Sequence, residues 1–219
     1  MRMSIRNHDM LALLQDHAGR FGDDLAHVLP DRDITYRRLW SRIERGSARL
    51  CGEWHVRAGD VVAYVGRGHP DAIVLYFALL RIGAKLLPLE AMSATQVTEV
   101  LAAYQPTLVI KDHAGADQLA SDHRVHPLHE LLASWSHHAP ALVDQTVSAR
   151  ALWLPDPDLE FQAYSLEQLC DSLPATSRKT FIDQKIFTAD VLREVVLPSL
   201  RDHRLMQFAA TDPVSDTGS

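Results

Sequence analysis

The first half of the chain alternates between short apolar runs and longer stretches with helical periodicity. Three apolar runs, at residues 61–66, 85–90 and 107–112, are typical of buried parallel strands. Residues 71–82 are apolar nearly all round and predict a deeply packed helix, while residues 93–104 predict an amphipathic helix. Strands that alternate with helices in this way predict an α/β fold with a mainly parallel sheet and right-handed crossovers.

The clearest helix should begin after Thr35, whose hydroxyl can cap it. Apolar side chains then recur on one face with helical spacing, at Tyr36, Leu39, Trp40, Ile43, Leu50, Cys51 and Trp54. Charged side chains fall toward the other face, namely Arg37, Arg38, Arg42, Glu44 and Arg45. We interpret this charged face as solvated surface and not as a site.

Weaker signals complete the pattern of the first two thirds. A short helix is expected at residues 10–19, followed by two short strands on either side of a turn at residues 30–31. Gly83 should end the buried helix, because glycine allows the chain to turn into the next strand. A weak strand near Val125 and a helix at about residues 128–135 follow.

The last third changes character, because residues 116–217 contain no glycine. One clear helix remains there, which Thr188 should cap and Pro198 should kink or end. Its apolar stripe must be covered by this chain or by another one, and it comprises Val191, Leu192, Val195 and Val196. We divide the chain into a subdomain at residues 1–150, an extension with this helix at 151–210, and a tail at 211–219 that we expect to be disordered.

Composition and charge exclude several classes of function. The chain carries 22 Lys and Arg against 28 Asp and Glu, a net charge of −6, with no basic stripe, so we expect no nucleic-acid partner. The longest apolar run, residues 72–80, is far shorter than the roughly 20 residues of a membrane span. No signal-peptide core is recognisable, and two isolated cysteines predict no disulfide framework. We therefore expect a cytoplasmic protein that does not bind a membrane.

Two motifs then suggest a family. Residues 34–39 read ITYRRL and residues 78–89 read ALLRIGAKLLPL. The turns, strands and helices between these motifs follow in the same order as in one family of enzymes. Over residues 10–112 the chain resembles the adenylate-forming (AMP-binding) superfamily of acyl-CoA synthetases, luciferases and peptide-synthetase adenylation domains. The resemblance implies the parallel-sheet-rich N-terminal subdomain of such a ligase, followed here by a divergent C-terminal helical extension. It also implies that these residues are scaffold.

The resemblance fails where the superfamily grips ATP. There, a strand leads into a loop rich in serine, threonine and glycine that wraps the phosphates and ends in a lysine. Residues 157–165 resemble the strand, but SLEQLCDSLPATSRKT follows. A phosphate cradle needs converging backbone N–H groups, which glycines allow, and Glu167 and Asp171 would repel the phosphates. Only Thr176, Ser177 and Lys179 are candidates for a remnant of this cofactor site.

Other groups of polar residues give no stronger signal. Five histidines gather in a short stretch without a metal-binding motif, so we expect no metal site; they are His123, His126, His129, His137 and His138. Gly66 and Gly68 follow a strand but lack the third glycine of a dinucleotide fingerprint. Asp156 and Asp158 are flanked by prolines, and we interpret them as loop residues.

The sequence therefore predicts no catalytic residue, and no cofactor bound by this chain alone; ATP and Mg²⁺ would bind only in a composite site. We expect a truncated, ligase-like protein that is not catalytic alone and acts as a partner subunit in the activation of acyl or aryl acids. It would work through a protein partner or by self-association. Two alternatives stay open: half of a split acyl-CoA or acyl-carrier-protein ligase, active as an acid–thiol or acid–AMP ligase only with a second polypeptide, and a decayed gene product.

Overall fold

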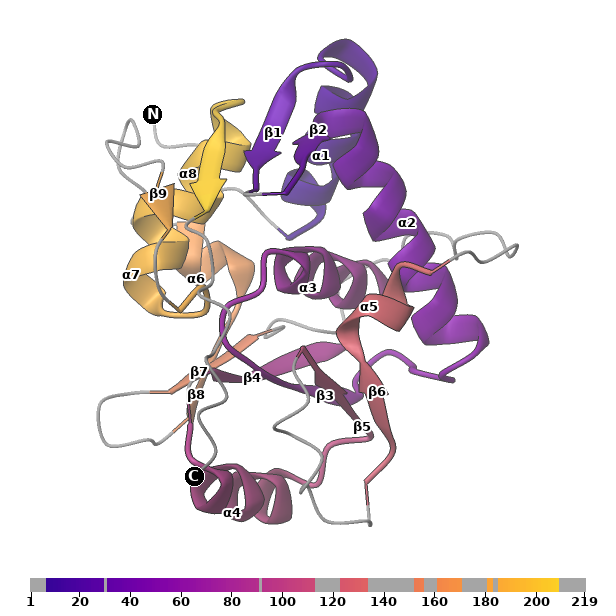
Figure 1. Ribbon diagram of the computed structural model, residues 1–219, viewed down its shortest axis with the longest axis vertical. Coiled ribbons are helices and arrows are strands. Elements are labelled where there is room, and N and C mark those ends of the chain that lie inside the picture. Colours follow the sequence, from indigo (N-terminus) through magenta and orange to yellow (C-terminus); the bar gives the residue numbers. More distant parts are fainter. Residues whose placement is uncertain are drawn as a thin grey trace.

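The computed structural model describes residues 7–29, 31–90, 92–112, 123–133, 152–155, 161–170, 181–182 and 185–208 (Figure 1). Within these ranges, two sheets and their helices enclose two clusters of buried apolar side chains. Among the described residues, every helix is too short or too polar to cross a membrane. The predicted tail at 211–219 lies outside them.

A six-stranded sheet forms the centre of the molecule, with the strand order β6-β5-β3-β4-β7-β8. Its strands are β3 (Val61–Gly66), β4 (Lys85–Glu90), β5 (Leu108–Lys111), β6 (Val125–Pro127), β7 (Leu152–Pro155) and β8 (Phe161–Tyr164). Neighbouring strands run parallel, except that β8 is antiparallel to β7. The predicted α/β class with a mainly parallel sheet is confirmed.

Helices cover both faces of this sheet (Figure 1). They are α2 (Tyr36–Gly52), α3 (Asp71–Ile82), α4 (Ala94–Tyr104) and α5 (Leu128–Leu131). Successive side chains of a strand point to opposite faces. Val62 and Tyr64 therefore join the cluster that contains α2 and α3, while Ala63 and Val65 join the one that contains α4. Both faces of β3 are therefore covered by other side chains and shielded from water, which explains its continuous apolar sequence.

Strands from the N-terminal and C-terminal parts of the described chain form a second sheet with the order β2-β1-β10-β9. Its strands are β1 (Leu25–Val28), β2 (Asp33–Thr35), β9 (Phe181–Ile182) and β10 (Met206–Phe208). The predicted pair β1 and β2 is antiparallel, and β10 lies parallel to β1. Residues beyond 150 thus complete both sheets, because β7 and β8 also extend the central one.

Local signals at the helix ends act as the sequence predicted. The Thr35 hydroxyl accepts a hydrogen bond from the backbone N–H of Arg38 at 3.3 Å and caps α2. Gly83 ends α3 in the left-handed region, with φ 82° and ψ 18°, where glycine carries no Cβ penalty. The helix expected at 128–135 is shorter than predicted, since α5 ends at Leu131.

The apolar stripe near the C-terminus is covered by this chain itself. The helical run consists of α7 (Ala189–Val191), the π-helical stretch η3 (Leu192–Val196) and α8 (Leu197–Arg201). Thr188 caps the run, as predicted, by accepting the N–H of Val191. The run packs against α1 (Asn7–Arg20) and α6 (Leu166–Cys170), and Leu192, Val195 and Val196 are buried. Of the two options for the stripe, the structure therefore has the intramolecular one.

Pro198 does not end this helix, which continues to Arg201. Proline has no N–H to donate to the preceding turn, and the turn before it is widened into the π-helical stretch. The predicted end at Pro198 was therefore wrong, and buried residues lie on both sides of the proline.

Replacing Gly83 by valine should cost about 1–3 kcal/mol, because a β-branched residue is strained at φ 82°. Urea unfolding of the two proteins measures the difference. Gly19→Val is the matched control, since Gly19 lies within α1 and an added Cβ would meet nothing within 4 Å. Equal stability losses in the two variants would contradict the left-handed helix end.

The double substitution Leu192→Asp and Val196→Asp should lower the free energy of unfolding by at least about 4 kcal/mol, since it places two carboxylates in an apolar core. Thermal and urea unfolding measure it. The control is Ala102→Asp with Ala103→Asp, which adds the same charges to exposed positions of α4. If both double variants are as stable as the parent, the C-terminal helical run does not seal this core.

Candidate functional site

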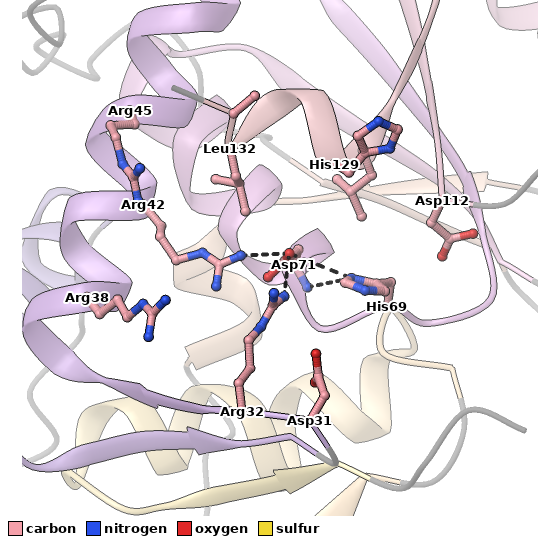
Figure 2. Close-up of a pocket in the computed structure, with 12 residues that line it drawn as sticks. Asp31, Arg32, Arg38, Arg42, Arg45, His69, Asp71, Asp112, His129 and Leu132 are labelled. Carbon is pink, nitrogen blue, oxygen red and sulfur yellow. Dashed lines mark hydrogen bonds and ion pairs between the residues drawn. The ribbon is translucent and has the colours of Figure 1, made fainter. Parts of the chain in front are cut away.

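A polar pocket of about 470 Å³ opens at the carboxyl ends of β3 and β5, beside the first turn of α3 (Figure 2). In open α/β sheets, this edge is where ligands usually bind. The pocket is lined by side chains from the β1–β2 hairpin, α2, the loop after β3, the end of β5 and α5, namely Asp31, Arg32, Arg38, Arg42, Arg45, His69, Asp71, Asp112, Leu128, His129, Leu132 and Ala133.

Three of the lining arginines belong to α2, on the face that the sequence led us to interpret as solvated. Arg38, Arg42 and Arg45 follow one another at intervals of four and three residues, so they share one face of the helix. The prediction of a solvated face was wrong for Arg42, whose side chain is only 7% exposed. Arg42 is buried because α3 packs along this flank of α2. The covered surface of α2 is therefore wider than its apolar stripe.

Asp71, the first residue of α3, organises the floor of the pocket. Its Oδ2 atom accepts hydrogen bonds from Arg42 at 2.7 Å and from Arg32 at 3.1 Å (Figure 2). His69 Nδ1 accepts the backbone N–H of Asp71 at 3.1 Å. Burial lowers the pKa of Arg42, the Asp71 carboxylate opposes that effect, and the charges of neighbouring arginines add to the lowering. One carboxylate thus links the hairpin, α2 and α3.

A second polar group borders the pocket at the end of β3. The Tyr64 hydroxyl donates to Asp112 and accepts the backbone N–H of His69 at 3.1 Å. The N–H of Arg67 also donates to Asp112, at 3.0 Å. A Cβ at Gly66 would overlap both the Tyr64 ring and the Asp112 carboxylate, so only glycine fits there. Burial, followed by the Asp112 charge, raises the pKa of Tyr64 well above its ordinary value.

Glu90, at the carboxyl end of β4, is a buried acid that our sequence reasoning missed. It is 5% exposed, and its Oε2 accepts the N–H of Phe187 at 2.8 Å. Burial raises its pKa to about 7, an effect that the N–H groups of Phe187 and Ile186 oppose. The available signal was an acid directly after the apolar run LLPL of this strand. Glu90 anchors the segment before α7 to the central sheet.

The other predicted residues fall in different places. Thr176, Ser177 and Lys179 lie outside the described residues, as do Asp156, Asp158, His137 and His138. His126 stacks on Trp54 and faces Glu130, while His129 lines the pocket. Across the part of the chain that the structure describes, no three His, Cys, Asp or Glu side chains form a group that could hold a metal ion. The described lining consists mainly of charged side chains, four arginines and three aspartates, and so offers ionic recognition.

Comparison with known proteins adds three findings. The family model described as AMP-binding enzyme matches residues 14–174. Phosphinothricin tripeptide synthetase PhsC of Streptomyces viridochromogenes is 34% identical over 119 residues, 53% of this chain and 11% of that protein, and a carboxylic acid reductase of Mycobacterium marinum is 35% identical over 101 residues, 45% of this chain and 8% of that protein. The chain thus spans about a tenth of the length of these curated relatives.

A solved structure reproduces the fold. The N-terminal subdomain of Klebsiella oxytoca NpsA, in complex with anthranilyl-AMSN, superposes with a TM-score of 0.70 at 22% identity. The match covers 91% of this chain and 52% of that one. The α/β architecture is therefore that of the N-terminal part of an adenylate-forming enzyme.

Ionisation of Glu90 should lower the free energy of unfolding as pH rises from about 4.5 to about 7. The folded state holds the Glu90 proton up to about pH 7, whereas the unfolded state releases it near 4.5, so the folded state binds more protons in this window. In Glu90→Gln, the decrease in the free energy of unfolding over this pH range should be smaller than in the parent by on the order of 2–3 kcal/mol. Asp112 and Lys185, which also act on Glu90, are unchanged in the variant.

Urea unfolding at several pH values from 4.5 to 8 measures this contribution, as the difference in free energy between parent and variant. Glu99→Gln, which removes an exposed acid from α4, is the control and should keep the slope of the parent. A Glu90→Gln protein with the parent's full slope would show that Glu90 is already ionised in the folded state below pH 7.

Proposed function

Because the chain belongs to the family of AMP-binding enzymes, we propose that it is the N-terminal lobe of an acid-activating ligase and does not form acyl-adenylates alone. It acts as a partner subunit, and a second polypeptide or chain segment supplies the nucleotide site. The relatives support carboxylic acids as the substrate class, since one is named a carboxylic acid reductase and the NpsA subdomain was solved with an anthranilyl ligand. The cytoplasmic location predicted from sequence is part of the same proposal.

The observation that carries this proposal is the structure immediately after β8. The Ser165 hydroxyl accepts the N–H of Gln168 at 3.1 Å, and the Gln168 side chain accepts the N–H of Ser165 at 2.8 Å. This reciprocal capping starts helix α6 at the point where the resemblance places the phosphate-gripping loop. The backbone N–H groups of Ser165 and Gln168 are therefore engaged within the cap.

Two features of the described residues support the proposal that ATP and Mg²⁺ do not bind to this chain alone. A triphosphate needs several free N–H groups or cations around it, and Mg²⁺ needs carboxylates beside the phosphates. Here the N–H groups of Gln168 and Leu169 are bonded to Ser165, and the described residues contain no group of three potential metal ligands. The remnant candidates Thr176, Ser177 and Lys179 stay candidates only. We therefore derive no reaction step through ATP in this chain.

Within this proposal, the chain contributes a structural scaffold beside the composite site and no reacting side chain. The central sheet presents its carboxyl edge, and the second sheet closes the N-terminal hairpin onto the C-terminal strands. A split acyl-CoA or acyl-carrier-protein ligase is the form of this function in which the second polypeptide brings the phosphate-gripping loop with its terminal lysine. ATP and Mg²⁺ would then bind at the composite site.

Calorimetric titration of the full chain with ATP·Mg should give no saturable heat at nucleotide concentrations up to about 1 mM. A dissociation constant of that size corresponds to a binding free energy of only about −4 kcal/mol. An intact acyl-CoA synthetase, titrated in parallel, is the positive control. A micromolar isotherm would contradict the proposal, and its loss in Lys179→Ala would assign the binding to the remnant.

The partner role has a separate test. The chain is co-expressed with the polypeptides encoded beside it, and acid-dependent exchange of pyrophosphate into ATP is measured for each mixture. Activity that needs both polypeptides supports the composite site. Full activity in a neighbour without this chain, together with no change on adding it and no association by light scattering, would contradict a partner role.

A further inference from the structure

We propose that the pocket between α2, α3 and α5 binds a small organic phosphate, and that Arg38 and Arg45 are its main contacts. The inference does not rest on the proposed function. Figure 2 shows Arg38, Arg42 and Arg45 arranged along one side of the pocket, with Arg32 rising toward Asp71 from the hairpin. Two separate elements thus bring four guanidinium groups to one cavity of about 470 Å³.

The charges in this pocket are not balanced by the protein. Four arginines face three aspartates, which leaves one net positive charge when both lining histidines are neutral. Asp71 is shared by Arg42 and Arg32 through a single oxygen. Asp112 accepts from Tyr64 and from the N–H of Arg67, so it is committed to the end of β3. A positive cavity in a chain of net charge −6 is a local concentration of charge that attracts anions.

Two of the four guanidinium groups are available to a ligand. In the part of the chain that the structure describes, Arg38 uses its backbone N–H to bond Thr35, and its exposed side chain is recorded in no hydrogen bond or ion pair. Arg45 donates through Nε to the carbonyl of Ser41 at 3.4 Å, which leaves its terminal amino groups toward the pocket. Each guanidinium can donate two parallel N–H bonds to an oxyanion.

A phosphate monoester fits this arrangement better than a carboxylate does. The Asp71 carboxylate already pairs with the inner arginines, Arg42 and Arg32. The outer pair, Arg38 and Arg45, carries two further charges, which a dianion with three acceptor oxygens can neutralise together. Repulsion among the arginines is already evident, because Arg32, Arg38 and Arg45 all lower the pKa of Arg42. A bound dianion would relieve that repulsion.

The apolar part of the lining suggests that the phosphate belongs to an organic molecule. Leu128, Leu132 and Ala133, from α5 and the residues that follow, add an apolar surface to the otherwise charged pocket. The cavity volume lies in the range of sites for small organic ligands. The ligand class is therefore a phosphate ester whose apolar part rests on α5 while its phosphate meets α2.

The test uses phenyl phosphate and inorganic phosphate as probes of the full chain, at constant ionic strength, in calorimetry and thermal unfolding. We expect saturable binding of both, tighter for phenyl phosphate, and a rise in the unfolding temperature. The double variant Arg38→Gln with Arg45→Gln should weaken binding at least roughly tenfold, because it removes two charge-assisted contacts. Arg37→Gln is the matched control: Arg37 lies on α2 outside the pocket lining, in an exposed pair with Asp23, and its loss should leave binding unchanged.

Three results would overturn the proposal. The first is no saturable binding of either probe by the parent chain up to about 10 mM, where affinity becomes negligible. The second is equal weakening in Arg37→Gln and in the double variant, which would mean a diffuse effect of surface charge. The third is binding of benzoate as tight as that of phenyl phosphate, which would exclude a phosphate-specific site. Thermal unfolding without ligand checks that the variants are folded.

Discussion

Helix α3 is buried at all twelve of its positions, and the rest of the described structure is arranged around its enclosure. The central sheet covers one side of it and α2 covers another, so no flank is left to carry polar side chains into solvent. A helix in this position depends on how its ends are satisfied. Gly83 closes the C-terminal end through its left-handed conformation, and its N–H reaches the carbonyls of Leu79 and Leu80.

The N-terminal end of α3 carries a charge that must also be compensated. Asp71 is buried, and an isolated carboxylate there would be strongly disfavoured. Arg42 and Arg32 compensate it, and in doing so they fix α2 and the hairpin to the helix end. Breaking such a buried pair is costly, even where forming it adds little net stability. The pocket follows from this pairing. When Arg42 bonds Asp71, Arg38 and Arg45, which share its face of α2, are brought to the same side of the helix.

The C-terminal third of the chain closes the fold that the first two thirds begin. Glu90 ties the segment before α7 to β4, β10 pairs with β1, and the apolar stripe of the C-terminal helical run packs on α1 and α6. Immediately after β8, Ser165 and Gln168 cap each other and begin helix α6.

Local periodicity and end signals determined much of the architecture in advance. The apolar runs of β3, β4 and β5, the all-round apolar sequence of α3, the Thr35 and Thr188 caps and the role of Gly83 are all encoded within a few residues of where they act. These features depend on backbone geometry and on burial of contiguous side chains, which a sequence pattern records directly. The family resemblance rested on the same short segments.

Only the tertiary structure decided which polar residues are buried and which of them meet. Arg42 belongs to a face that the sequence pattern marks as exposed, and it is buried because α3, distant in sequence, packs on that flank. Burial raises the pKa of Glu90, and the N–H groups that oppose this rise come from a segment almost a hundred residues away. The cover for the stripe at Leu192 and Val196 was equally undecided in the sequence. Burial and ionisation at these positions depend on contacts between remote elements, which no local pattern contains.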